Sequence, residues 1–187
     1  MSKILEQQEE DKMESYSLWL RPVPGKVYQD AIKMYDEIGF PPHVTLCPSF
    51  QTKNPKEVEH IARKIAKRCG RVRLEFKELD HSKAFFKCVF VRLKSTGSLM
   101  RATAIARNEI ASSSIEYSRK DEVFDPHISI AYGERPPKER ERIVSELKKM
   151  FEPTKTVSLV SSLIVVCTTK RERYSEWTIN LEVQITK

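Results

Sequence analysis

The chain has 187 residues, enough for one large domain or for two small lobes that share a core. Hydrophobic residues make up 40% of it, and no apolar run approaches the roughly 20 residues that cross a bilayer, so we expect a folded protein without a membrane span. The net charge of +7 suits an anionic substrate or a nucleic-acid end, although a basic surface of this kind is also common.

The first 14 residues are charged and lack the apolar core of a signal peptide. We therefore expect a flexible tail over residues 1–14, a single bilobal domain over 15–187, and an intracellular, cytoplasmic location. Association with the secretory pathway or the Golgi stays open.

In chain order, the first half reads as alternating helices and strands. A strand over 16–20 precedes a helix over 27–38, which Gly39 and the following prolines end. A strand over 43–47 leads to a helix with Asn54 as its cap, Pro55 in its first turn and Gly70 at its end. Strands follow over 72–76 and 84–93.

The same order then returns. A helix over 98–110, a strand over 127–131, a helix over 137–150 and strands over 157–166 and 177–185 repeat the pattern helix, strand, helix, strand, strand. A duplicated α+β unit with a pseudo-twofold axis would place the middle strands of the two halves across a shared cleft.

These middle strands carry matching motifs, Pro42-His43-Val44-Thr45 and Pro126-His127-Ile128-Ser129, whose histidines at 43 and 127 are 84 positions apart. Residues i and i+2 of a strand point to one face, so each motif presents an imidazole beside a hydroxyl. Two such pairs facing each other would hold a phosphate between Thr45 and Ser129, with a proton carrier on either side. A single motif of this kind arises often by chance, whereas two in matched contexts favour catalysis.

This arrangement predicts cleavage of a phosphodiester without a metal or cofactor. We expect His127 to act as the general base on water and His43 as the general acid, although the pseudo-symmetry leaves the assignment open. Asp125 is the carboxylate nearest to His127 in sequence and could orient or charge it. His60 and His81 lack such contexts, and we interpret both as surface residues.

Four aromatic residues lie on or beside predicted strands, and a nucleobase could stack on them: Trp19, Phe86, Tyr132 and Trp177. Core packing is the alternative for each. The loop at Lys170–Arg173 could cover the cleft and contact a diphosphate. In the basic cluster of residues 63–73, Arg63, Lys64, Lys67 and Arg68 are expected to form the solvated face of their helix.

The four cysteines, Cys47, Cys69, Cys88 and Cys167, form no C-x-x-C pair and no zinc-finger spacing. Because Cys47, Cys88 and Cys167 lie in apolar runs typical of strands, we expect these three to be small buried side chains in a reducing compartment. A nucleophilic Cys47, two residues past Thr45, is the alternative.

Together these motifs resemble the 2H phosphoesterase superfamily, and within it the plant and fungal cyclic nucleotide phosphodiesterases. The resemblance rests on Tyr16–Trp19, Pro42–Thr45, Phe85–Phe90, Pro126–Tyr132 and Ser175–Trp177. It implies a bilobal α+β fold in which two antiparallel sheets line a central cleft, with helices outside. It also implies metal-independent conversion of nucleoside 2′,3′-cyclic phosphates to 2′-phosphates. It implies in addition the opening of ADP-ribose 1″,2″-cyclic phosphate, a tRNA-splicing by-product, to the 1″-phosphate. Separately from the resemblance, we expect a monomer.

By position, His43, His127, Thr45 and Ser129 match the catalytic and phosphate-binding places, and Tyr132, Trp19 and Trp177 match cleft aromatics. Lys87 stands where a plant relative carries an uncharged polar residue, and residues 95–120 match poorly. One alternative keeps the fold but acts on RNA ends, as a 2′-5′ ligase-like enzyme or an exonuclease. Another binds nucleotides or RNA ends without catalysis.

Overall fold

The computed structural model describes residues 12–23, 25–35, 39–119, 121–152, 157–169 and 173–185. Most of the expected tail lies outside these ranges, and the first strand already begins at Glu14. Within the described ranges, no helix has the length and apolar character needed to cross a membrane.

The elements follow one another as β1 (Glu14–Pro22), α2 (Lys26–Tyr35), β2 (Val44–Thr52), α3 (Pro55–Cys69), β3 (Arg73–His81), η1 (Phe85–Lys87), β4 (Val89–Leu93), α4 (Gly97–Ala111), β5 (His127–Ala131), α5 (Pro137–Met150), β6 (Val157–Cys167), η3 (Tyr174–Glu176) and β7 (Thr178–Gln184). Each predicted helix and strand corresponds to one of these elements, although β2 and β3 each extend five residues further along the chain than expected. Helix α3, for example, begins after Asn54, whose side chain accepts a hydrogen bond from the Glu57 N–H.

One predicted strand is wrong in its first half. Residues 84–93 were expected to be continuously extended, but Phe85–Lys87 form a 3₁₀ turn and the strand begins only at Val89. The turn is held because the Lys87 N–H donates to the Ala84 carbonyl. The apolar run does not distinguish this turn from a strand.

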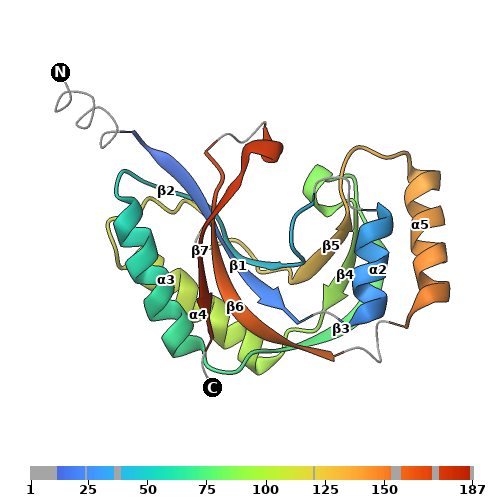
Figure 1. The fold of residues 1–187 in the computed structure, drawn as a ribbon, viewed down its shortest axis with the longest axis horizontal. Helices are drawn as coiled ribbons and strands as arrows, with labels where there is room; N and C mark the ends of the chain where they lie inside the picture. The colour runs from blue at the N-terminus through green and yellow to red at the C-terminus, as the bar shows by residue number, and fades with distance from the viewer. Residues whose placement is uncertain are drawn as a thin grey trace.

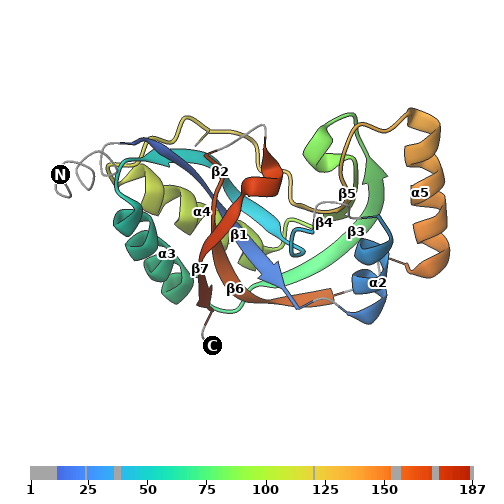
Figure 2. The same ribbon diagram turned by 45° about the horizontal axis from the view of Figure 1, so that its top comes forward.

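The described strands run antiparallel in the order β2-β1-β6-β3-β4-β5, with β7 paired to β6. Two lobes result, as Figures 1 and 2 show. The His43 lobe contains β2, β1, β6 and β7 with α3 and α4 outside, and the His127 lobe contains β3, β4 and β5 with α2 and α5 outside. Their sheets join where Arg73–Glu75 of β3 pair with Val157–Leu159 of β6. The predicted α+β fold is confirmed, with the sheets linked rather than separate.

The internal repeat is real, but it begins one strand earlier than the sequence pattern suggested. Its two copies are β1-α2-β2-α3-β3 and β4-α4-β5-α5-β6, and β7 is additional. The register supports this: Trp19 of β1 pairs with Thr45, as Phe90 of β4 pairs with Ser129. The last strand of each copy is exchanged, because β3 pairs with β4 and β6 pairs with β1.

Along the strands, residues buried in the core alternate with residues on the other face of the sheet. Leu46 of β2 and Ile128 of β5 are fully buried in the main core, together with the alternate residues of β1, β4 and β6. Since the strand period is two, the intervening residues point away from the helices. The two motifs are therefore held on the face between the lobes by strands whose other face is packed.

Candidate active site

A pocket of about 650 Å³ lies between the lobes. It is lined by all eight residues that the sequence indicated: His43, Thr45, His127, Ser129, Trp19, Phe86, Tyr132 and Trp177. The volume falls within the range of about 300–1,000 Å³ that small-molecule sites occupy, so the pocket has room for a nucleotide.

The first motif is fixed by a backbone carbonyl and an indole ring. His43 Nδ1 lies 2.8 Å from the Pro41 carbonyl oxygen. A carbonyl only accepts, so Nδ1 carries the proton and Nε2 remains for chemistry. On the ring face, Trp19 stacks on His43 with centroids 3.6 Å apart, and the Trp19 Nε1–H donates to Ser17 Oγ at 2.8 Å.

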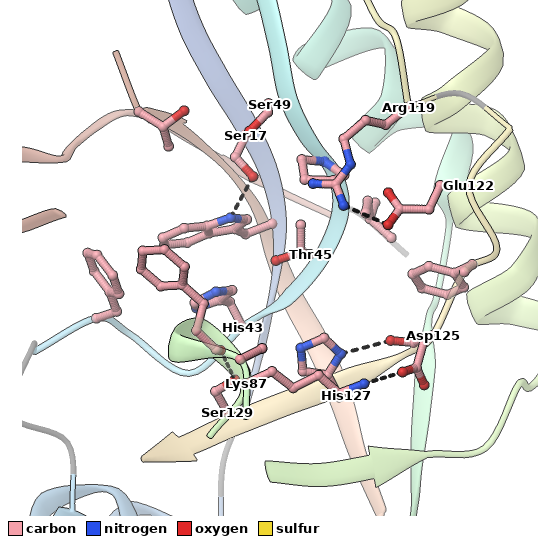
Figure 3. Close-up of a pocket in the computed structure, with 18 of the residues that line it drawn as sticks. Ser17, His43, Thr45, Ser49, Lys87, Arg119, Glu122, Asp125, His127 and Ser129 are labelled. Atoms are coloured by element: carbon pink, nitrogen blue, oxygen red, sulfur yellow. Dashed lines mark hydrogen bonds and ion pairs between the residues drawn. The ribbon is translucent and has the colours of Figure 1, made fainter. Parts of the chain in front are cut away.

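The second motif repeats this geometry with different neighbours. His127 Nδ1 lies 2.8 Å from the carbonyl oxygen of Asp125, again two residues earlier, as Figure 3 shows. Phe90 meets the ring edge-on, with centroids 5.4 Å apart. The Ser129 hydroxyl donates to the Phe86 carbonyl at 2.7 Å, so the 3₁₀ turn anchors this side chain.

Burial favours the neutral form of both imidazoles. Desolvation against Trp19 lowers the pKa of His43 to about 4, and the charge of His127 contributes in the same direction. Desolvation also lowers the pKa of His127, to which Lys87 and Arg92 add, while the Asp125 carbonyl and carboxylate oppose the change.

The cations beside His127 belong to an ion-pair network that has no counterpart at His43 among the described residues. Lys87 pairs with the Asp125 carboxylate, and Arg92 bridges Asp125 at 2.6 Å and Asp80 at 2.7 Å. The Lys87 ammonium also lies 4.4 Å from the centre of the Phe90 ring. The Asp125 carboxylate thus pairs with these cations, and its backbone carbonyl is the group that orients His127.

The aromatic residues form one end of the pocket. Trp177 stacks between Phe40 and Phe86, with centroid distances of 5.4 and 5.2 Å. Trp19 is only 3% exposed and Tyr132 is buried, whereas Phe86 is 40% exposed. Little of Trp19 or Tyr132 is therefore open to a base, and Phe86 is the one of the four with the largest exposed fraction.

The sequence pattern missed several lining residues. One of them is Phe40, which lies just before the Pro41-Pro42 pair. Its position next to the first histidine motif could have indicated that it lines the pocket. Arg107, Arg119 and Glu122 line the opposite end from a segment that carries no recognisable motif. Only the fold brings that segment beside β2, through the bridge between Gln51 and Glu116.

Other expected features lie elsewhere. Cys47 is fully buried and burial raises its pKa to about 12, so the thiolate needed for nucleophilic attack is not formed. His60 is exposed on α3 as expected. The expectation for His81 was wrong: it ends β3 opposite Val89, and its Nδ1 is buried with no hydrogen-bond partner among the described residues. Lys170 to Glu172 lie outside the described ranges, and Arg173 pairs with Glu176.

Comparison with known proteins agrees with this architecture. The family model described as the 2′-5′ RNA ligase superfamily matches residues 38–166. Escherichia coli LigT complexed with 3′-AMP superposes with a TM-score of 0.61 at 13% identity, over 94% of this chain and 100% of that one. No curated protein sequence matches the chain significantly.

Two further solved structures share the fold. The protein TT0787 of Thermus thermophilus matches with a TM-score of 0.58 at 11% identity, covering 91% of this chain and 97% of that one. Kluyveromyces marxianus Usb1 matches with a TM-score of 0.53 at 12% identity, covering 94% and 98%. At these identities the likeness concerns the fold alone.

Proposed function

This chain belongs to the 2′-5′ RNA ligase superfamily, the 2H phosphoesterases, and we propose that it is a metal-independent cyclic phosphodiesterase of the plant and fungal type. Its substrates are nucleoside 2′,3′-cyclic phosphates, opened to 2′-phosphates, and ADP-ribose 1″,2″-cyclic phosphate. One observation carries the proposal: two imidazole–hydroxyl pairs, one at the start of β2 and one on β5, line a single pocket.

The reaction requires one proton to be removed and one to be delivered. Water attacks the phosphorus, its proton passes to His127 Nε2, the bond from phosphorus to O3′ breaks, and O3′ takes a proton from His43 Nε2. Thr45 and Ser129 donate to the non-bridging oxygens as charge builds on them. Ser129 must turn its hydroxyl away from the Phe86 carbonyl to do so.

The asymmetry between the histidines supports this order of roles. Lys87 and Arg92 lie beside His127, where both pair with Asp125, and their charges favour the neutral imidazole that a base needs. The pKa of His43, by contrast, is low chiefly because the ring is desolvated. A phosphate anion entering the pocket would raise the pKa of His43 and allow it to carry the second proton.

The test is incubation with 2′,3′-cyclic AMP in EDTA, followed by chromatographic separation of 2′-AMP from 3′-AMP. We expect 2′-AMP from the wild-type protein, and His43→Ala and His127→Ala should each reduce turnover by roughly 10²–10⁴-fold without unfolding the protein. Substantial activity in either variant would exclude the two-histidine mechanism.

A sulfur leaving group separates the two roles. In a cyclic substrate with sulfur in place of O3′, the departing thiolate needs no proton, so His43→Ala should regain activity while His127→Ala should not. Recovery in His127→Ala alone would reverse the assignment.

One observation favours RNA ends as the alternative substrate. A second hollow of about 500 Å³ shares Val123, Phe124 and Asp125 with the pocket, and it is also lined by Lys77, Arg92 and Lys94. A strand extending from the bound nucleotide could follow it, although these cations are paired with Glu75, Glu78 and Asp80. Faster cleavage of an oligonucleotide than of cyclic AMP would support this alternative, and tight binding of cyclic AMP without turnover would support a non-catalytic role.

A further inference from the structure

The pocket has two chemically different ends with the histidine motifs between them. Aromatic rings form one end, and Arg107, Arg119 and Glu122 line the other. In the view of Figure 3, Arg119 lies on one side of Thr45 and His43 lies on the other. A ribose cyclic phosphate held at the motifs would therefore have a charged wall beside it.

This wall carries the surplus positive charge of the pocket. Among the described lining residues, Lys87, Arg107 and Arg119 are cationic, while Glu122 and Asp125 are anionic. Lys87 is matched by Asp125. Arg119 pairs with Glu122 at 2.6 Å, and Arg107 donates to the Glu122 backbone carbonyl at 2.6 Å, which leaves the arginine end with one carboxylate for two guanidinium groups.

The two arginines differ in freedom. Arg107 emerges from α4, packs over the Phe124 ring 5.9 Å from its centre, and donates to the Glu122 carbonyl, so it is anchored within the wall. The Arg119 side chain is 45% exposed and pairs with the Glu122 carboxylate. Because a guanidinium offers several donors in a planar fork, Arg119 can keep Glu122 and still present N–H groups to an anion.

A backbone irregularity in β2 adds a hydroxyl to the pocket lining. Tyr16 pairs with Phe50 while Leu18 pairs with Cys47, so Pro48 and Ser49 bulge from the ladder. Ser49 has a φ of 50°, a left-handed conformation that costs a residue with a side chain about 1 kcal/mol or more. This bulge brings Ser49 into the pocket lining.

Resting on the proposed function, we infer that Arg119, together with Ser49 and Arg107 of the same pocket lining, forms a subsite for a phosphate carried on the 5-carbon of the ribose whose cyclic phosphate is opened. The same chemistry occurs in two sources. ADP-ribose 1″,2″-cyclic phosphate bears its diphosphate there, and the last nucleotide of an oligonucleotide bears its phosphodiester there. A plain nucleoside 2′,3′-cyclic phosphate lacks the group.

The test compares three substrates in wild-type protein and in Arg119→Gln: adenosine 2′,3′-cyclic phosphate, ADP-ribose 1″,2″-cyclic phosphate, and a diadenylate ending in a 2′,3′-cyclic phosphate. We expect Arg119→Gln to lower the ratio of kcat/KM for a tailed substrate to that for the nucleoside by roughly 10-fold. The substrate with a phosphate on the 5-carbon whose ratio falls in Arg119→Gln shows whether the subsite binds the diphosphate of ADP-ribose or the phosphodiester of an oligonucleotide. Arg101→Gln, on the exposed face of α4, removes the same charge outside the pocket and should leave both ratios unchanged.

Glu122→Gln provides the opposite change. Removing the carboxylate takes a negative charge from beside Arg119, so the ratio should rise for the same tailed substrate. Ratios that stay constant in both variants, or an equal loss on all three substrates in Arg119→Gln, would overturn the subsite.

A binding measurement distinguishes failure of this inference from failure of the proposed function. Calorimetry with adenosine 2′,5′-bisphosphate and with 2′-AMP needs no turnover, and the wild-type protein should prefer the bisphosphate by roughly 10-fold, a preference that Arg119→Gln abolishes. Equal affinities in the wild-type protein overturn the subsite alone. No binding of either compound overturns both proposals.

Discussion

Trp19 lies face to face with His43, with ring centroids 3.6 Å apart and planes that differ by only 8°. Thr45, the other half of the same motif, is the residue that pairs with Trp19 across the strands. The indole thus closes one face of the catalytic imidazole and leaves its edge to the pocket.

Replacing this ring should release His43. In Trp19→Leu, water reaches the imidazole, so the pKa of His43 should rise from about 4 toward 6.5, and kcat should fall as the ring loses its fixed orientation. An NMR pH titration of the His43 ring protons measures the first effect. The stability loss should be about 2–4 kcal/mol, because a large buried side chain is truncated. An unchanged titration would mean that the indole does not control His43.

Removal of the Thr45 and Ser129 hydroxyls should have similar effects on catalysis but different effects on the stability of the protein. Thr45→Ala and Ser129→Ala should each raise the barrier by about 2–4 kcal/mol if they act like oxyanion donors. Ser129 also donates to the backbone carbonyl of Phe86, so Ser129→Ala should lower unfolding stability by about 1 kcal/mol as well. Urea unfolding of both variants measures the difference in stability. Thr45→Ser keeps the hydroxyl and is the control that should retain activity.

Lys87 should set the acidic limb of the pH–rate profile. Its charge lowers the pKa of His127, so Lys87→Gln should raise that pKa and move the limb to higher pH, because a base is inactive once protonated. Asp125→Asn removes the opposing charge and should move the limb to lower pH, while the backbone carbonyl still orients the ring. Lys83 is exposed and lies just before the 3₁₀ turn, so Lys83→Gln should leave the acidic limb in place. Shifts in the same direction for Lys87→Gln and Asp125→Asn would contradict the electrostatic account.

His43 should also make the protein sensitive to acid. Its pKa is about 4 when folded and 6.5 ordinarily, so the unfolded chain binds the proton first as the pH falls. The stabilisation is fully present above pH 6.5 and is lost on descent to pH 4, amounting to at most about 3 kcal/mol. Unfolding free energies at pH 7 and 4.5 should therefore differ less in His43→Gln than in the wild-type protein. His60→Gln, on the exposed face of α3, should show the wild-type difference.

The sequence predicted the elements and the motif geometry because both depend on local periods. Alternation in β2 and β5 is enough to place His43 with Thr45 and His127 with Ser129, and the Asn54 cap locates α3. The 3₁₀ turn at Phe85–Lys87 could not be predicted, since its residues are as apolar as those of the strand that follows. Arg119 and Phe40 also escaped, because a long-range arrangement places them in the pocket.

The repeat shows the same limit. Strands β3 and β4 are consecutive and pair with each other, so chain order assigns them to one unit, whereas the boundary between the copies falls between them. The register Trp19–Thr45 and Phe90–Ser129 reveals the correct division, and register is a property of pairing that no single strand carries.

The exchanged strands also constrain how the molecule can be assembled during synthesis. Strand β1 is flanked by β2 and by β6, which lies far later in the chain, at Val157–Cys167. A nascent chain therefore holds an incomplete sheet, with the exposed edge of β1 unpaired, until nearly all of the chain has left the ribosome. Contacts of such long sequence separation slow folding and expose apolar edges to aggregation. Truncation before β6 should therefore remove a central strand of the His43 lobe, the one that pairs with both β1 and β3. The lobes that carry the two histidines should consequently fold only together.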